Sequence, residues 1–177
     1  KYVITVVANS GSFTYDGSEH TVSGFKTLTF TLNGATFTVE GLTSGAARTN
    51  SGTTVTQVQG VSKVLDAEGN DVTDQFTVHY QPAKLVVKPR AVTLTSASGK
   101  KVYDGTALTS KWLLDNGKIT EEVTVSGDGF AAGEGATFGV IGSRVNVGKS
   151  DNEFAYRLNR NTDANNYTIE VVKGELE

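Results

Sequence analysis

The sequence predicts a mostly β protein made of two small tandem modules, β-grasp-like or immunoglobulin-like, arranged end to end as an elongated pair. Two observations predict this class. Apolar and polar residues alternate with a period of two in most segments, which is typical of strands with one buried face. In addition, the second half of the chain repeats a pattern of residues found in the first half, as tandem modules do.

The repeat is clearest at the start of each half. Val3–Gly17 reads VITVVANSGSFTYDG and aligns without a gap with Ala91–Gly105, which reads AVTLTSASGKKVYDG. Three weaker matches follow in the same order in both halves: Phe37–Gly41 with Val123–Gly127, Gln75–Val78 with Asn166–Ile169, and Lys84–Val86 with Glu175–Glu177. A collinear series of matches indicates two copies of one module, 1–89 and 90–177.

Segments rich in Thr, Val, Phe and Tyr predict the strands, because these residues pack well on a pleated surface. The expected strands are Tyr2–Val7, Thr27–Leu32, Ala35–Glu40, Val55–Val58, Phe76–Tyr80, Lys84–Lys88, Ala91–Thr95, Glu122–Ser126, Thr137–Ile141, Glu153–Leu158 and Tyr167–Val172. Asn33-Gly34 predicts a hairpin between the second and third of these. Helical residues occur only at Leu108–Leu114 and Lys118–Val123, so we expect at most one short helix per module.

Pro89 marks the boundary between the modules. Proline fixes φ and lacks a backbone donor, so strand pairing should stop there. No Gly/Ser-rich linker surrounds it. A short junction of this kind predicts a semi-rigid pair of modules.

The composition excludes several classes of function. Cysteine is absent, so disulfides, thiolate metal sites and cysteine nucleophiles are excluded. The sequence pI is about 5.4 and there is no basic cluster, so we expect no nucleic-acid partner. No apolar stretch is long enough to span a membrane as a helix. We expect a monomer without a cofactor.

The repeated segments resemble a known family of surface repeats. FTYDGS at Phe13–Ser18 and KVYDGT at Lys101–Thr106 look like the signature of YDG-type and MBG-type repeats. The module ends, GNDVTDQFTVHYQPAKLVVKPR and NNYTIEVVKGELE, are similar to the closing strands of these repeats, although Ala83 stands where Gly is usual. The resemblance implies an extracellular segment of a bacterial adhesin or cell-wall-anchored surface protein, acting as a stalk, spacer or adhesive module. It also implies host glycans or glycoproteins as partners of the whole protein.

The two Tyr-Asp-Gly turns are predicted to be structural equivalents. Asp16-Gly17 and Asp104-Gly105 are turn dipeptides, and both glycines are expected to have positive φ. Tyr15 and Tyr103 are expected in matching buried or half-buried positions, with each hydroxyl bonded to the backbone.

Two other groups of residues allow a ligand. Trp112, the only tryptophan, lies among apolar residues that favour a core position, with Phe25 in its place in the first module; the alternative is a platform for a sugar ring. An acidic segment could form either a calcium loop or a strand-joining turn, and the turn explains all of its oxygen-bearing residues: Asp66, Glu68, Asn70, Asp71 and Asp74.

No residues assemble a catalytic motif. His20 and His79 are the only histidines, no Gly-x-Ser-x-Gly segment surrounds a serine, and His79 alternates toward solvent in its strand. Glu121, Glu122 and Asp128 are scattered carboxylates. We therefore expect no enzymatic activity. A Lys–Asn or Lys–Asp isopeptide bond is a further hypothesis for a module without cysteine.

Overall fold

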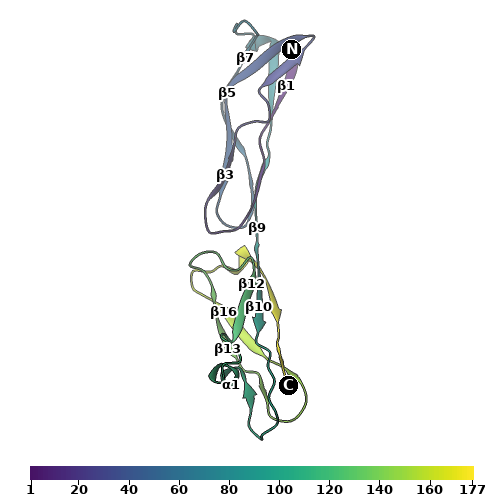
Figure 1. Cartoon of the computed structure of the whole chain (residues 1–177). Helices are drawn as coiled ribbons and strands as arrows, with labels where there is room; N and C mark the ends of the chain where they lie inside the picture. Colours follow the sequence, from purple (N-terminus) through teal and green to yellow (C-terminus); the bar gives the residue numbers. More distant parts are fainter. The chain divides into compact units, whose positions relative to one another are not determined.

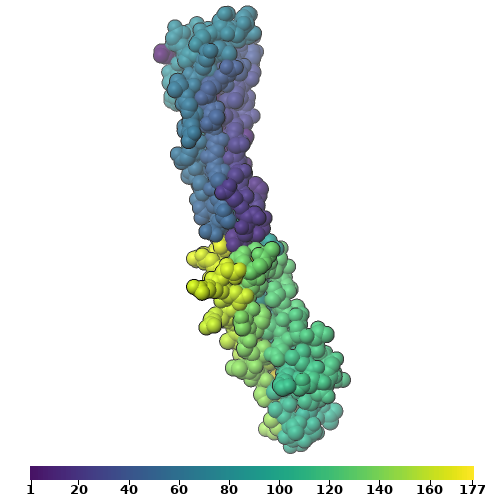
Figure 2. Space-filling model, turned by 90° about the vertical axis from the view of Figure 1, so that its left-hand side faces the viewer, coloured from purple at the N-terminus to yellow at the C-terminus, as the bar shows by residue number.

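The computed structural model describes all 177 residues. It is mostly β and divides into two compact units, Lys1–Lys88 (unit 1) and Pro89–Glu177 (unit 2). The colouring of Figure 2 follows this division: purple to blue atoms form one unit and green to yellow atoms the other. No helix is long and apolar enough to cross a membrane.

Unit 1 contains nine strands and one turn of 3-10 helix: β1 (Tyr2–Val7), β2 (Gly11–Thr14), β3 (His20–Ser23), β4 (Thr29–Leu32), β5 (Ala35–Arg48), β6 (Gly52–Val55), β7 (Gln57–Leu65), η1 (Thr73–Gln75), β8 (Phe76–Gln81) and β9 (Lys84–Lys88). The long strand β5 pairs with β3, β4 and β7. Strand β9 lies between β2 and β6, and β1 pairs with β8.

Unit 2 contains shorter strands and the only α-helix: β10 (Arg90–Ser96), β11 (Leu108–Thr109), α1 (Ser110–Asp115), β12 (Val123–Gly127), β13 (Ala136–Val140), β14 (Ser143–Arg144), β15 (Ser150–Asp151), β16 (Phe154–Leu158), η2 (Ala164–Asn166), β17 (Tyr167–Val172) and β18 (Glu175–Leu176). Strand β10 lies between β12 and β17. The remaining strands form the pairs β11–β14, β13–β16 and β15–β18.

The first and late strands of the two units pair in the same way. In unit 1, β1 runs parallel to β8 with Val3 opposite Thr77; in unit 2, β10 runs parallel to β17 with Ala91 opposite Thr168. The sequence alignment matches these same residues to one another. The two first strands also bury equivalent side chains, listed here as unit 1 with unit 2: Ile4 with Val92, and Val6 with Leu94.

One of the weaker sequence matches is wrong. Val123, at the start of β12, lies opposite Ser96 of β10, whereas Phe37–Gly41 belongs to β5, which does not pair with β1. Ala8 is the counterpart of Ser96 in unit 1, and it forms a bridge with Phe25. Phe25 is therefore the counterpart of Val123. The mismatch arises because unit 2 has an α-helix between β11 and β12, which shifts the later numbering.

Most strand predictions agree with the structure to within a few residues, but two do not. The predicted strand Val55–Val58 is wrong, because it spans the end of β6, Thr56 and the start of β7. The other large difference is in β5. This strand was expected to end at Glu40 but continues to Arg48. Its register shifts between Glu40 and Leu42. Gly41 lies at the shift, Gly60 of β7 lies opposite Leu42, and both glycines have positive φ. A Cβ on either glycine would overlap the opposite backbone, so the glycines form a bulge within a continuous strand.

Sequence patterns missed most of β7 and several short strands. The missed short strands contain between two and four residues each, too few to show a period: β2, β3, β11, β14, β15 and β18. The Asn33-Gly34 hairpin is confirmed: Leu32 lies opposite Ala35, and both turn residues have positive φ. The single helix α1 overlaps the expected segment Leu108–Leu114 and extends one residue beyond it, to Asp115, whereas Lys118–Val123 is not helical.

Each unit has its own apolar cluster. The cluster of unit 1 contains Ile4, Val6, Val39, Val64 and Phe76. In unit 2, Leu108, Leu113 and Leu176 form a cluster that joins β11, α1 and β18. Figure 1 shows α1 and the C-terminus at the same end of unit 2, as this cluster requires.

Candidate functional site

The two Tyr-Asp-Gly turns have the same backbone conformation. Gly17 has φ of 83° and Gly105 of 78°, so the prediction of positive φ is confirmed. The preceding aspartate closes each turn in the same way. Asp16 Oδ1 accepts from the Ser18 amide and Asp104 Oδ1 from the Thr106 amide, each at 2.9 Å.

The prediction for the two tyrosines is wrong. Tyr15 is 5% exposed, but Tyr103 is 60% exposed. The cause is the strand beside each turn. The Tyr15 amide donates to the Lys88 carbonyl at 2.8 Å, at the end of a ladder between β2 and β9. In unit 2 the matching ladder reaches Glu177, whose carbonyl accepts from the Lys101 amide at 2.9 Å.

The side chains around the two turns differ. In unit 1, the Phe13 ring stacks on His20 with centroids 4.4 Å apart, and His20 Nε2 lies 2.9 Å from Asp16 Oδ1. The residues at these positions in unit 2 are Lys101 and Leu108. The turn and its aspartate are therefore repeated, but the side chains that flank them are not.

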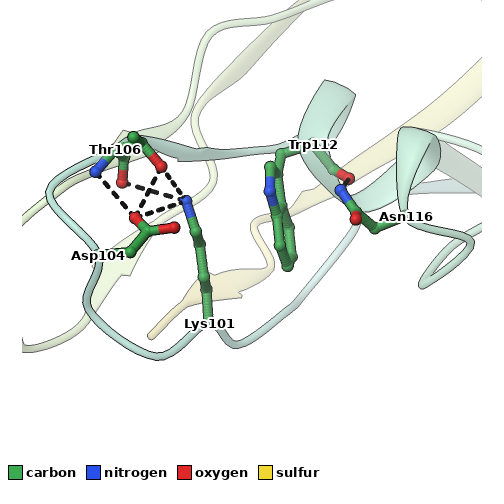
Figure 3. A network of polar contacts seen from close by, with 5 residues as sticks. All are labelled: Lys101, Asp104, Thr106, Trp112 and Asn116. Carbon is green, nitrogen blue, oxygen red and sulfur yellow. Dashed lines mark hydrogen bonds and ion pairs between the residues drawn. The ribbon is translucent and has the colours of Figure 1, made fainter.

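Lys101 is the centre of a polar network in unit 2, which Figure 3 shows from close by. Its side chain is only 7% exposed, and its Nζ lies 3.0 Å from Asp104 Oδ1. The same Nζ donates to the Thr106 hydroxyl and lies 5.0 Å from the centroid of the Trp112 ring, a cation–π distance.

Asp104 is held in its charged form by this network. The Thr106 hydroxyl, which donates to Asp104 Oδ1 at 2.7 Å, is the largest cause, followed by the Thr106 amide and then by Lys101. Together they lower the pKa of the Asp104 carboxyl from 3.8 to about 2. The network consists of hydrogen bonds that fix a turn, and the carboxylate acts in it as an acceptor.

Trp112 is half-buried in α1. Its amide donates to Thr109 Oγ1, the N-cap of the helix, and its ring packs against the cluster of Leu108, Leu113 and Leu176. Lys101 covers one face of the ring (Figure 3), so a sugar could stack on that face only after displacing Lys101. Phe25 is not its counterpart, because Phe25 has the position of Val123.

A second repeated motif was missed by the sequence analysis. Arg48–Gly52 reads RTNSG and Arg144–Gly148 reads RVNVG, so both units contain Arg-x-Asn-x-Gly. In each unit the arginine Nη2 donates to the carbonyl three residues later, which is Ser51 in unit 1 and Val147 in unit 2.

The glycine of this motif leaves room for the arginine. Gly52 and Gly148 both have strongly positive φ, of 134° and 131°. A Cβ on either residue would overlap the guanidinium of its own unit. The two arginines also pair alike, since Arg48 lies opposite His20 and Arg144 opposite Leu108.

Each unit buries a polar side chain where its last strands meet. In unit 2, Asn152 is fully buried and its Nδ2 donates to the Ala97 carbonyl and to Ser110 Oγ, both at 2.8 Å. In unit 1, Thr56 Oγ1 lies 2.7 Å from the Tyr80 hydroxyl. The backbone amides of Thr56 and Asn152 donate to equivalent carbonyls, those of Ala83 and Gly174.

Unit 2 has an open groove of about 560 Å³ beside its Tyr-Asp-Gly turn. It is lined by two segments, Lys100–Tyr103 and Arg144–Lys149, together with Thr106, Leu108 and Glu177. Several side chains at this groove are apolar and exposed: Val102, Tyr103, Val145 and Val147.

The acidic segment of unit 1 folds as a turn. Asp66 Oδ1 accepts from the amides of Glu68 and Asn70, and Asp71 Oδ1 accepts from the amide and hydroxyl of Thr73. These bonds lower the pKa of both aspartates, mainly through Asn70 and Thr73 respectively. No group of three His or acidic side chains in the chain is placed to hold a metal ion.

The expected exposure of His79 is confirmed, since its side chain faces solvent in β8.

Comparison of the chain with protein-family models, with curated proteins and with solved structures gave no match.

Proposed function

We propose that this chain is a non-catalytic extracellular repeat segment of a bacterial surface protein, which acts as a stalk, a spacer or an adhesive module. The observation that carries the proposal is that the residues shared by the two units are structural ones. They share buried strand residues, turn glycines and the Arg-x-Asn-x-Gly motif, all of which determine the backbone path. A repeated scaffold is what a tandem structural segment requires.

The side chains near these shared positions support the same proposal, because they differ between the two units. Phe13 and His20 beside the first turn are replaced by Lys101 and Leu108 beside the second. A site that bound or transformed the same molecule in both units would need the same groups in both. The location at the cell surface and a relation to YDG-type or MBG-type repeats are supported by the residues FTYDGS and KVYDGT alone.

For a stalk, the units should be joined end to end. The connection between them favours this, because β9 ends at Lys88 and β10 begins at Arg90, so that Pro89 alone separates the last strand of one unit from the first strand of the next. A one-residue proline junction permits little reorientation.

Small-angle X-ray scattering tests the proposed arrangement. A single compact domain of this length would have a radius of gyration of about 16 Å. We expect a clearly larger value, with a long tail in the distance distribution. A value near 16 Å would rule out the spacer role for this pair. The matched control replaces Pro89 with a flexible Gly-Ser segment, which should broaden the distribution.

The alternative is a module that binds carbohydrate or glycoprotein through Trp112. A glycan array separates the two functions. The spacer predicts no signal from the chain, whereas a lectin-like module predicts binding that Trp112→Ala abolishes. The variant Lys101→Ala removes the side chain that covers the ring, and it should strengthen binding if a sugar stacks on that face.

A further inference from the structure

The first strand of unit 1 has an open edge that the first strand of unit 2 does not have. In unit 2, β10 lies between β17 and β12, whereas in unit 1 its counterpart β1 pairs only with β8. A short segment covers one end of this edge: the Lys26 amide donates to the Val7 carbonyl at 2.9 Å, and the Asn9 amide donates to the Gly24 carbonyl at 3.0 Å. The chain then leaves the edge and forms β4, which pairs with β5.

The uncovered part of the edge presents the backbone groups of Val3 and Thr5. Along a strand, the N–H and C=O groups of alternate residues point to opposite edges. Val7 and Asn9 direct theirs toward the segment 24–26, so Val3 and Thr5 direct theirs to the same edge, where no strand lies. In unit 2 the matching edge is covered by β12, which runs antiparallel to β10. An antiparallel strand therefore fits along this edge.

The residues of this edge do not protect it from pairing. Exposed edge strands are normally blocked by a lysine, a proline or a bulge. Tyr2–Val6 reads YVITV and contains no charge and no proline, and its register with β8 has no shift. The edge also borders a groove of about 300 Å³, whose apolar lining includes Val3 and Ile4 of β1 and Phe30 and Leu32 of β4. Since β4 pairs only with β5, two open strand edges border one apolar groove.

We propose that the open edge of β1 is the contact through which two copies of this chain associate, with β1 paired antiparallel to β1. Val3 and Thr5 are two residues apart, so a two-fold axis at Ile4 places Val3 of each copy opposite Thr5 of the other. Each of these pairs exchanges two hydrogen bonds, which satisfies the uncovered amides and carbonyls of both residues. This association differs from the monomer expected from the sequence.

The same arrangement covers the groove. Residues directly opposite in an antiparallel pair point to the same face of the sheet. Ile4 therefore lies beside Ile4 of the second copy on the groove side, and Val3 lies beside Thr5 of the second copy on the outer side. The β1–β8 pairs of the two copies continue into one sheet over the apolar lining of both grooves. A second copy is favoured over an unrelated strand because this edge is its own complement in hydrogen bonding and in apolar character.

Sedimentation velocity at increasing concentrations measures the association, and hydrogen exchange locates it. We expect a dimer whose fraction rises with protein concentration. Exchange at the Thr5 amide should slow as the dimer forms, whereas the Thr93 amide, whose residue lies opposite Ser126 of β12, should be protected at every concentration. A chain that stays monomeric up to about 1 mM, where even weak contacts form, would overturn the proposal.

Pairs of charges test the register of the two strands. Val3→Lys with Thr5→Lys places lysines opposite one another across the axis and should weaken dimerisation at least tenfold. Val3→Glu with Thr5→Lys places opposite charges there and should retain the dimer. The control, Val61→Lys with Ala91→Lys, adds the same two positive charges at exposed positions away from the edge and should leave dimerisation unchanged.

Equal dimerisation of the Lys-Lys and Glu-Lys chains would mean that the contact uses another surface or another register, and would overturn the proposal. Val3 and Thr5 are both exposed, so circular dichroism should show that the two chains keep their fold. If either chain fails to fold, exchange at Thr5 in the unsubstituted chain decides alone: a rate that does not change while a dimer forms would place the contact elsewhere.

Discussion

At the scale of single residues, the turn glycine Gly105 has space for a side chain but a backbone conformation that other residues rarely adopt. A Cβ on Gly105 would contact nothing within 4 Å, yet its φ of 78° lies in the left-handed region. The cost of a larger residue at this position is therefore backbone strain alone, without a steric clash.

Gly105→Val should destabilise unit 2 by more than about 1 kcal/mol, because a β-branched residue is strained at positive φ. Chemical denaturation followed by Trp112 fluorescence measures this. The control is Gly139→Val in β13, where a Cβ also meets nothing within 4 Å but φ is not in the left-handed region. Equal effects of the two substitutions would show that conformation at Gly105 is not the cause.

Asp104 makes a pH-dependent contribution to stability. Its folded-state pKa of about 2 lies below the ordinary 3.8, so the fold favours the charged form. The contribution is complete above pH 3.8 and is lost as the pH falls through about 2.

NMR titration of the Asp104 carboxyl should give a midpoint near 2. Thr106→Val removes the hydroxyl donor and should move the midpoint toward 3.8. Lys101→Met should move it less, because Lys101 contributes less than the Thr106 hydroxyl and amide. A larger effect from Lys101→Met would mean that charge, and not hydrogen bonding, sets the pKa.

At the scale of elements, the buried polar side chain of unit 2 connects strands that are distant in sequence. Asn152 in the loop after β15 bonds the Ala97 carbonyl and the Ser110 hydroxyl, and its own carbonyl accepts from Ser96 Oγ. These contacts join β10, α1 and β15 in one network.

Asn152→Ala should cost about 1–3 kcal/mol, since it leaves buried partners without hydrogen bonds. Urea denaturation measures the change. The corresponding substitution in unit 1 is Thr56→Val, which keeps the shape of the side chain but removes the hydroxyl next to Tyr80. An unchanged midpoint for Asn152→Ala would mean that water replaces the amide without loss.

Sequence patterns predicted the strands and turns whose own residues have strong conformational preferences. Tyr2–Val7, Lys84–Lys88 and Tyr167–Val172 agree with β1, β9 and β17 to the residue, because each combines alternation with β-branched residues. The turns at Asn33-Gly34 and Asp104-Gly105 were predicted for the same reason, since their residue types have strong conformational preferences.

The rest depended on contacts that are distant in sequence. The Tyr-Asp-Gly residues alone do not distinguish Tyr103 from Tyr15, whereas in the fold the Tyr15 amide bonds the Lys88 carbonyl at the end of β9. The Gly41–Gly60 bulge likewise became visible only once β5 and β7 were paired. The Arg-x-Asn-x-Gly motif, in contrast, was present in both halves and a systematic search for repeats would have found it.

At the scale of the whole molecule, the two units should respond separately to core substitutions. The only tryptophan lies in unit 2, so fluorescence reports on unit 2 while circular dichroism reports on both units. Leu94 and Val6 are equivalent buried residues in the two units.

Leu94→Ala should lower the fluorescence midpoint by an amount equivalent to about 2–5 kcal/mol, as expected for truncation of a buried leucine. Val6→Ala should leave the fluorescence midpoint unchanged and lower part of the circular dichroism transition. A single transition that shifts equally with either substitution would show that the chain unfolds as one cooperative unit.

The parallel pairing of early and late strands has a mechanical consequence. In unit 1, β1 runs parallel to β8, and β2 runs parallel to β9, the strand that leads out of the unit. A force that pulls the ends of the unit apart therefore drives these neighbouring strands in opposite directions along their own axes. The hydrogen bonds of each ladder are loaded together in shear. They must therefore break almost simultaneously, and not one after another. A unit connected in this way resists extension under load even if its equilibrium stability is modest.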